Sequence, residues 1–248
     1  MNATTRPVAV ITGSSAGIGA ATAHELARLG FEVVLGARRL DRIQALAGEL
    51  GGRAQALDVT DAASVQAFAA QVSVAAVLVN NAGLSRGLDP VEKGSEAHWR
   101  EMLETNVMGL LRVTRALLPA LSRAPLAHIV NVGSVAGLEV YAGGGGYTAT
   151  KHAVRAISQT LRLELVGRPI RVTEIDPGMV ETEFSLVRFD GDAARAKKVY
   201  EGLKPLGGED VADCIGWVVT RPAHVNIDQI VVKPIAQASA TVAARKQS

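Results

Sequence analysis

The sequence feature that most restricts the fold of this chain is an apolar run that leads directly into a glycine-rich turn. Residues 8–11 have the composition of a buried parallel strand, and the residues that follow read Thr-Gly-Ser-Ser-Ala-Gly-Ile-Gly. Glycines at positions 13, 17 and 19 leave out side chains where a turn is tight and where a diphosphate would approach the backbone. Residues 20–29 then show helical spacing and end at Gly30, a common C-terminal cap. A strand, a glycine turn and a helix N-terminus in this order predict an anion site of the dinucleotide-binding kind.

The second predicted strand, residues 32–37, ends where the adenosine ribose of a bound dinucleotide would lie. An acidic residue in this place normally receives the ribose 2′-hydroxyl and selects NAD, but here the chain reads Ala37-Arg38-Arg39. Guanidinium groups suit a 2′-phosphate, so the pair predicts NADP(H), with the Ser14 hydroxyl as a further donor. The alternative interpretation is a solvated basic pair at the head of the helix predicted over residues 40–50.

The rest of the chain continues to alternate strands with helices, which predicts one α/β domain over residues 1–248. Hydrophobic residues make up 48% of the chain, enough for a full core. Residues 184–206 are polar and are expected to cover the site, and residues 236–248 are expected to form a flexible tail. The further strands are expected over residues 53–57, 76–79, 127–132, 169–175 and 229–233, and the further helices over residues 62–72, 95–121, 147–165 and 209–219.

Polar residues stand at or after several of these strands. Paired amides at Asn80 and Asn81 follow the fourth strand and can tie neighbouring strand ends together. Ser134 follows the fifth strand, at the edge where open α/β sheets bind their ligands. Asn106 interrupts the apolar pattern of the long helix predicted over residues 95–121, so it is either a structural hydrogen-bond bridge or part of a reaction centre.

Tyr147 and Lys151 are separated by one helical turn, which places a phenol and an ammonium over one pocket. A neighbouring positive charge stabilises the phenolate and brings its pKa closer to neutral pH. Such a tyrosine can protonate a carbonyl oxygen or deprotonate an alcohol. The spacing alone is only suggestive, and it gains weight from the cofactor site predicted upstream. A flexible glycine run, residues 143–146, leads into the tyrosine.

Composition excludes several other classes of function. The formal charge is only +2 and no basic block occurs, so no nucleic-acid partner is expected. No apolar span is long enough to cross a membrane, and the five histidines lack metal-binding spacing. The single cysteine, Cys214, is expected as a buried residue on a helix. These observations predict a cytoplasmic protein that acts on a small molecule and holds no metal.

Taken together, these residues resemble the short-chain dehydrogenase/reductase family over roughly residues 6–235. The motifs are the glycine turn, Asn80-Asn-Ala-Gly83, Asn106, Ser134, Tyr147-x-x-x-Lys151 and Pro177-Gly178, in order and at the family's spacing. The resemblance implies a single Rossmann-type domain whose seven-stranded parallel sheet has the order 3-2-1-4-5-6-7, with helices on both faces.

The resemblance also implies roles for the matched residues. Tyr147 would be the acid or base, Ser134 would hold the substrate oxygen, and Lys151 would bind the nicotinamide ribose and tune Tyr147. Asn106 would position a water that links Lys151 to solvent. The residues expected to bind NADP(H) are Gly13, Ser14, Ser15, Gly17, Ile18, Gly19, Arg38, Arg39, Asp58, Val59, Asn80, Ala82, Gly83, Tyr147, Lys151, Pro177, Gly178, Val180 and Thr182.

Within the family, the second half of the chain is similar to NADP-dependent 3-hydroxy acid dehydrogenases, the group that includes serine 3-dehydrogenase-like enzymes. A 3-hydroxy acid carries a carboxylate, for which Arg188 in the expected cover is the first candidate and Arg86 the second. One alternative is a reductase of broad tolerance for neutral ketones and aldehydes, to which the glycine run before Tyr147 would give room. The other is a non-catalytic NADP sensor on the same fold. The apolar faces of the two long helices predict a homo-oligomer, a tetramer or a dimer.

Overall fold

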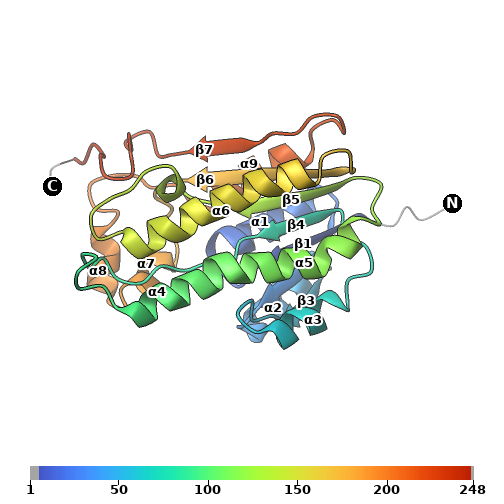
Figure 1. Ribbon diagram of the computed structural model, residues 1–248, viewed down its shortest axis with the longest axis horizontal. Helices are drawn as coiled ribbons and strands as arrows, with labels where there is room; N and C mark the ends of the chain where they lie inside the picture. The colour runs from blue at the N-terminus through green and yellow to red at the C-terminus, as the bar shows by residue number, and fades with distance from the viewer. Residues whose placement is uncertain (1–5, 247–248) are drawn as a thin grey trace.

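The computed structural model describes residues 6–246, and its centre is one parallel β-sheet (Figure 1). The strand order is β3-β2-β1-β4-β5-β6-β7, which confirms the predicted topology. Every pair of neighbouring strands is parallel, so all seven carboxyl ends lie at one edge of the sheet. The strands are β1 (Val8–Thr12), β2 (Glu32–Ala37), β3 (Arg53–Ala56), β4 (Val77–Asn80), β5 (Ala127–Val132), β6 (Ile170–Pro177) and β7 (Gln229–Val232).

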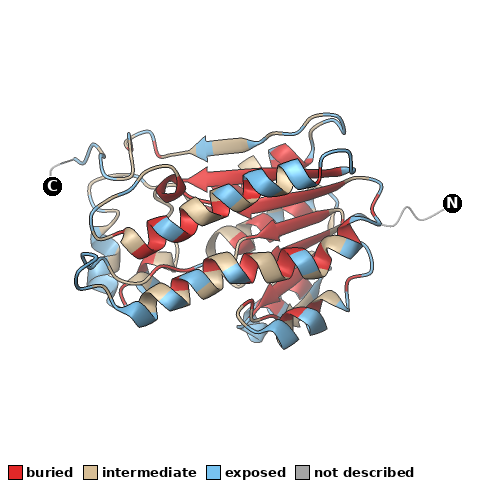
Figure 2. Ribbon diagram, in the orientation of Figure 1, coloured by how far each residue is buried: buried red, intermediate tan, exposed pale blue. Residues whose placement is uncertain are grey.

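Helices cover both faces of the sheet. One core contains side chains of α3, α5 and the end of α6, and the other contains side chains of α1, α2 and α9. Alternate residues of each inner strand enter opposite cores, and Figure 2 shows these strands mostly buried. The helices are α1 (Gly17–Arg28), α2 (Leu40–Leu50), α3 (Ala62–Ala69), α4 (Glu96–Leu103), α5 (Leu110–Leu121), α6 (Gly145–Glu164), α7 (Phe184–Arg188), α8 (Ala193–Lys198) and α9 (Gly208–Val219), with a 3₁₀ turn η2 (Val135–Gly137).

The long helix predicted over residues 95–121 contains a π-helical segment. This segment, η1 (Glu104–Gly109), joins α4 to α5 without a break. The extra residue in a π turn displaces the register of a helix, and such segments concentrate at functional sites. Buried Asn106 lies within it. Pro119 lies in the last turn of α5, which ends at Leu121.

The glycine run before Tyr147 is part of a packed helix start rather than a flexible lead. Helix α6 begins at Gly145, and a side chain on Gly146 would clash with the Met102 Cε. A Cβ on Gly145 would lie 3.1 Å from the Trp99 ring. These glycines therefore let α6 approach α4 closely, and the space expected for bulky substrates is filled by protein.

The segment over residues 236–246 also differs from the flexible tail that the sequence indicated. Gln237 is 5% exposed and its Oε1 accepts a hydrogen bond of 2.8 Å from the Met179 backbone N–H. The Ala240 N–H donates to Glu139, and Lys246 N–H donates to Gly202. The remaining two residues of that expected tail, 247 and 248, lie outside the described residues.

Candidate active site

A cavity of about 720 Å³ lies at the carboxyl edge of the sheet, beneath α7 and the segment after α8. Figure 1 shows α7 and α8 at the end toward which the strand arrows point. Most of the predicted site residues line this cavity, from the glycine turn through Tyr147 to Arg188. Five predicted residues do not line it: Ser14, Gly19, Asn80, Asn106 and Arg86, the second candidate for a substrate carboxylate.

The glycine turn is shaped by close approaches that a side chain would block. Gly13 has a φ of 65°, and a Cβ there would lie 2.8 Å from the Ala82 Cα. Gly17 has a φ of 57°, and its Cβ would meet Thr182 at 2.9 Å. Gly19 lies beneath the turn, where a Cβ would be 2.5 Å from the Asn81 amide nitrogen. The N-terminus of α1 has no side-chain cap and no acidic residue in its first turn, so its N–H groups suit a diphosphate.

The paired amides have the structural role that the sequence suggested. Asn80 Nδ2 donates to Thr114 and to Asn131, and so ties β4 to α5 and to β5. Asn81 Nδ2 donates to the carbonyl oxygens of Thr12 and Gly13 at 2.9 and 3.1 Å. Asn80 thus supports the cavity from behind, and Asn81 fixes the glycine turn.

Arg38 and Arg39 both line the cavity where β2 ends. The predicted donor Ser14 is fully buried and its hydroxyl points to the Gly36 carbonyl, because the turn directs it into the sheet. Its neighbour Ser15 lines the cavity instead, and its Oγ accepts from Arg39 at 2.8 and 3.0 Å. At this end of the cavity the lining residues are therefore Arg38, Arg39 and Ser15, with Ser15 in the place predicted for Ser14.

Ser134, Tyr147 and Lys151 meet on the floor of the cavity, each less than a tenth exposed. The Ser134 N–H donates to Asp176 Oδ1 at 2.8 Å, and the Ser134 Oγ accepts from the Ala136 N–H. Lys151 Nζ lies 5.8 Å from the centroid of the Tyr147 ring and donates to the Val132 carbonyl at 2.8 Å. The residues predicted from spacing are thus brought together.

The charge balance around Tyr147 differs from the sequence-based expectation. Burial raises the pKa of Tyr147. The positive charge of Arg188 and a hydrogen bond from Ser134 both act to lower this pKa. The Arg188 guanidinium carbon lies 5.3 Å from the ring centroid. Burial lowers the pKa of Lys151 to about 8, although the negative charges of Asp176 and Glu174 act to raise it. Tyr147 is therefore a protonated phenol at neutral pH, and two cations are available if it ionises.

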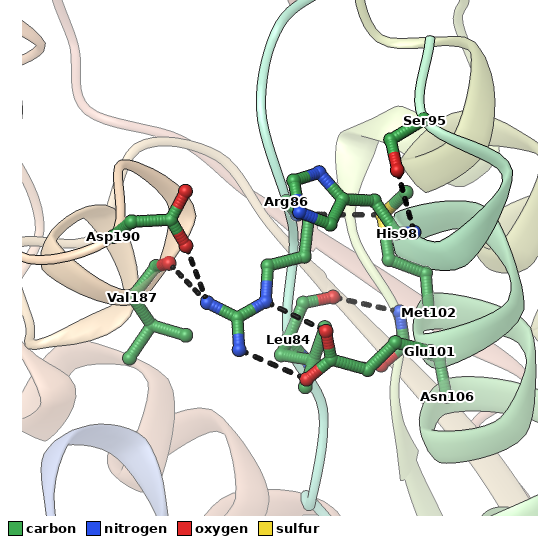
Figure 3. A network of polar contacts seen from close by, with 9 residues as sticks. All are labelled: Leu84, Arg86, Ser95, His98, Glu101, Met102, Asn106, Val187 and Asp190. Carbon is green, nitrogen blue, oxygen red and sulfur yellow. Dashed lines mark hydrogen bonds and ion pairs between the residues drawn. The ribbon is translucent and has the colours of Figure 1, made fainter.

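Asn106 lies behind the catalytic floor. Its amide accepts from the Leu84 N–H at 2.8 Å and donates to the Leu84 carbonyl and to Thr150 Oγ1. Figure 3 shows its pairing with Leu84. The side chain therefore fixes the loop that follows β4 against α6, and of the two predicted roles the hydrogen-bond bridge is observed.

The two candidate arginines for a substrate carboxylate lie in different surroundings. Arg86 makes two hydrogen bonds of 2.8 and 2.9 Å to Glu101 and one of 2.9 Å to Asp190 (Figure 3). Arg188 lines the cavity, donates to Ser85 and Tyr141, and pairs with no carboxylate among residues 6–246. Because Arg86 is already neutralised, Arg188 is the one of these two arginines that is left for an anionic ligand.

Several cavity residues carry no motif in the sequence. Tyr141, Phe184 and Tyr200 form an aromatic and polar wall, and Gln237 with Ala240 comes from the C-terminal segment. Asp176, which directly precedes the Pro177-Gly178 pair, holds the Ser134 backbone without lining the cavity. Its place beside that motif is the one signal that could have indicated it.

Among the described residues no helix is long and apolar enough to cross a membrane, and none of their histidine, cysteine and carboxylate side chains gather as metal ligands. Cys214 lies on α9 and is half-buried rather than fully buried.

Comparison with known proteins identifies relatives along nearly the whole chain. An uncharacterized oxidoreductase of Mycobacterium tuberculosis is 59% identical over 238 residues, which cover 96% of this chain and 95% of the relative. The NADP-dependent 3-hydroxy acid dehydrogenase YdfG of Escherichia coli K12 is 41% identical, with 97% and 100% of the two chains covered. A serine dehydrogenase solved in its closed form with NADP⁺ superposes with a TM-score of 0.91 at 40% identity and covers 97% of this chain and 100% of its own.

The short chain dehydrogenase family matches residues 7–191, a span that contains every catalytic residue predicted from the sequence. With the sheet order, the glycine turn and the Ser134, Tyr147 and Lys151 cluster in place, the chain belongs to the short-chain dehydrogenase family of oxidoreductases.

Proposed function

We propose that this protein is an NADP(H)-dependent oxidoreductase that transfers hydride between the nicotinamide and the hydroxyl-bearing carbon of a 3-hydroxy acid. The observation that carries the substrate class is Arg188, a cation at the cavity without an acidic partner among the described residues, beside Tyr147. In a 3-hydroxy acid one carbon separates the carboxylate from the reacting carbon, so the carboxylate would lie within reach of Arg188. The names of the relatives, a 3-hydroxy acid dehydrogenase and a serine dehydrogenase, support the same class.

The glycine turn supports the cofactor assignment. The tight approaches at Gly13 and Gly17 leave backbone, and not side chains, facing the cavity where a diphosphate would bind. Arg38, Arg39 and Ser15 would hold the 2′-phosphate, and Asp58 and Val59, which line the same cavity, would contact the adenine. When bound, the nicotinamide supplies or takes up the hydride.

The protein's own chemistry is proton transfer at one oxygen atom. The Ser134 hydroxyl accepts from the Ala136 N–H, which leaves its own proton to donate to a substrate oxygen. Tyr147 holds its proton at neutral pH and passes it to the carbonyl oxygen in the direction of reduction. Arg188 and Lys151 then stabilise the phenolate that remains.

The roles of the supporting residues are part of the proposal. Lys151 would bind the nicotinamide ribose, since its ammonium lies at the cavity beside Tyr147. Asn106 would help to position the water that links Lys151 to solvent, and its fixed amide holds the π-helical segment in the shape that this requires.

A broad reductase of neutral carbonyl compounds is the second candidate. It is favoured by the apolar wall that Leu88, Phe184 and Val187 give the cavity. The room expected from the glycine run does not support it, because Trp99 and Met102 fill that space. A non-catalytic sensor of NADP has no use for an assembled Ser134, Tyr147 and Lys151.

We further propose that the protein is a cytoplasmic homo-oligomer, a tetramer or a dimer. Leu103, Met108, Leu163 and Val166 are between 40% and 81% exposed on the outer sides of α4, η1 and α6 or just beyond them. Such apolar side chains gain most from a second copy of the same surface. Light scattering that returned the mass of one chain at micromolar concentration would refute this.

A matched substrate panel tests the proposed function. NADP⁺ and NAD⁺ are each offered with 3-hydroxypropionate, serine and a neutral alcohol of similar size, and the Tyr147→Phe variant serves as the inactive control. We expect turnover with NADP⁺ and the 3-hydroxy acids. Activity confined to the neutral alcohol moves the assignment to the general reductase, and binding of NADP⁺ without turnover of any compound moves it to the sensor.

A further inference from the structure

One arginine of the proposed 2′-phosphate site, Arg39, is already engaged by Glu183, the acidic residue that directly precedes the cover. Arg39 Nη1 donates to Glu183 at 2.6 Å, and Arg42 Nη1 donates to the other oxygen of the same carboxylate at 2.7 Å. Glu183 comes directly before α7, and it lines the same cavity as Arg38 and Arg39. A single carboxylate thus joins the cofactor side of the cavity to the first residue of the substrate cover.

The Arg39 guanidinium donates to two kinds of oxygen, a hydroxyl and a carboxylate. Its Nε and Nη2 donate to the Ser15 hydroxyl in the glycine turn, and its Nη1 donates to Glu183. A phosphate group placed among Arg38, Arg39 and Ser15 would need the same guanidinium donors that the carboxylate now uses.

The charges favour an exchange of one anion for another. Arg39 and Arg42 share the Glu183 carboxylate, whereas Arg38 lines the same cavity and forms no salt bridge with a described residue, so a phosphate would also meet a guanidinium that no carboxylate holds. Hydrogen bonds from Arg42 and Arg39 lower the pKa of Glu183, so it stays ionised throughout the neutral range. The side chains of the pair are 44% and 42% exposed, so solvent weakens their attraction and a phosphate can replace the carboxylate.

We propose that Glu183 occupies the 2′-phosphate site as an internal competitor, which the 2′-phosphate of NADP(H) displaces from Arg39. This inference rests on the proposed function, because it requires that the cofactor carries a 2′-phosphate. It makes Glu183 a residue that sets the affinity for the cofactor, and it links the arrival of NADP(H) to the release of the cover at the start of α7.

The test is a binding measurement on the whole protein without substrate. Calorimetry compares adenosine 2′,5′-bisphosphate with adenosine 5′-monophosphate, which lacks the 2′-phosphate, in the wild type, Glu183→Gln and Glu181→Gln. Glu181 is the matched control, since it carries the same charge two residues earlier on the same loop, is exposed and forms no ion pair with another described residue.

We expect Glu183→Gln to bind the bisphosphate about 1.5- to 5-fold more tightly than the wild type, the range set by an exposed ion pair, and to bind the monophosphate as the wild type does. Glu181→Gln should resemble the wild type. Unchanged or weaker binding of the bisphosphate in Glu183→Gln, or equal tightening in Glu181→Gln, overturns the inference. A wild type that does not distinguish the two nucleotides refutes the NADP(H) preference itself, so the two failures are separable.

Discussion

Replacement of Arg188 by glutamine is the most informative change to the proposed substrate site. Glutamine keeps a polar side chain that can still reach Ser85, but it removes the positive charge beside Tyr147. If that charge binds the substrate carboxylate, the variant should lose affinity for 3-hydroxy acids and keep most of its activity toward neutral alcohols.

The size of the effect follows from the hydrogen bond that the Arg188 guanidinium would donate to a substrate carboxylate. A hydrogen bond to a charged group contributes about 1.5–3 kcal/mol, so kcat/KM for a 3-hydroxy acid should fall about 10- to 150-fold. Arg188 also opposes the effect of burial on the pKa of Tyr147, and this contribution affects every substrate alike. The readout is therefore the ratio of kcat/KM for the acid to kcat/KM for a neutral alcohol of the same size.

The assay is NADP⁺ reduction with 3-hydroxypropionate and with its neutral analogue, in the wild type, Arg188→Gln and Arg86→Gln. Arg86 is the matched control, because its charge is neutralised by Glu101 and Asp190. The ratio should collapse in Arg188→Gln alone. Equal losses for both substrates in Arg188→Gln would show that the arginine acts on Tyr147 or on the packing of Phe184, and the argument for a carboxylate site would be wrong.

Three further changes test other parts of the account. Tyr147→Phe keeps the buried ring and removes the proton donor, so turnover should fall by at least about 10²-fold while NADP⁺ binding by fluorescence stays unchanged; a variant with a tenth of the activity would mean that another donor acts. Gly146→Ala should lower the free energy of unfolding, measured by chemical denaturation, by about 1–3 kcal/mol, because the added methyl group clashes with Met102. Gly48→Ala, in open space on α2, should raise the same free energy slightly. Equal effects would contradict the close packing of α4 and α6. Burial and Arg171 hold the pKa of His128 at about 3 when folded. As the pH falls, the unfolded chain binds a proton at His128 before the folded protein does, so the free energy of unfolding decreases in acid. His128→Gln should reduce this decrease between about pH 7 and about pH 5 by about 2 kcal/mol. An unchanged decrease would show that other groups control it.

The parts of the fold that could be predicted from the sequence are those specified by local pattern. The apolar runs of β1, β2 and β5 are continuous because both faces of a parallel sheet are buried, so their bounds were readable. The glycine turn and the Tyr147 to Lys151 spacing are local as well, and their geometry follows from one turn or one helix.

The remainder depends on residues distant in the sequence. Nothing near Arg86 shows that Asp190, 104 positions away, neutralises it, and nothing near Ser14 shows that its hydroxyl turns inward to Gly36. Likewise, nothing near Asn106 shows that its amide bonds to Leu84 and Thr150, on distant parts of the chain. The small and polar residues of the C-terminal segment resemble a tail until the contact of Gln237 with Met179 is known.

The measurement that tests the central claim most directly is a single turnover with 3-hydroxypropionate that carries deuterium on carbon 3. The wild type, in excess over NADP⁺, should transfer the deuterium to the nicotinamide, which mass spectrometry of the isolated NADPH would detect, and Tyr147→Phe should transfer almost none. If no 3-hydroxy acid delivers deuterium to NADP⁺ while NADPH still reduces neutral ketones at this site, the assignment to 3-hydroxy acids is contradicted.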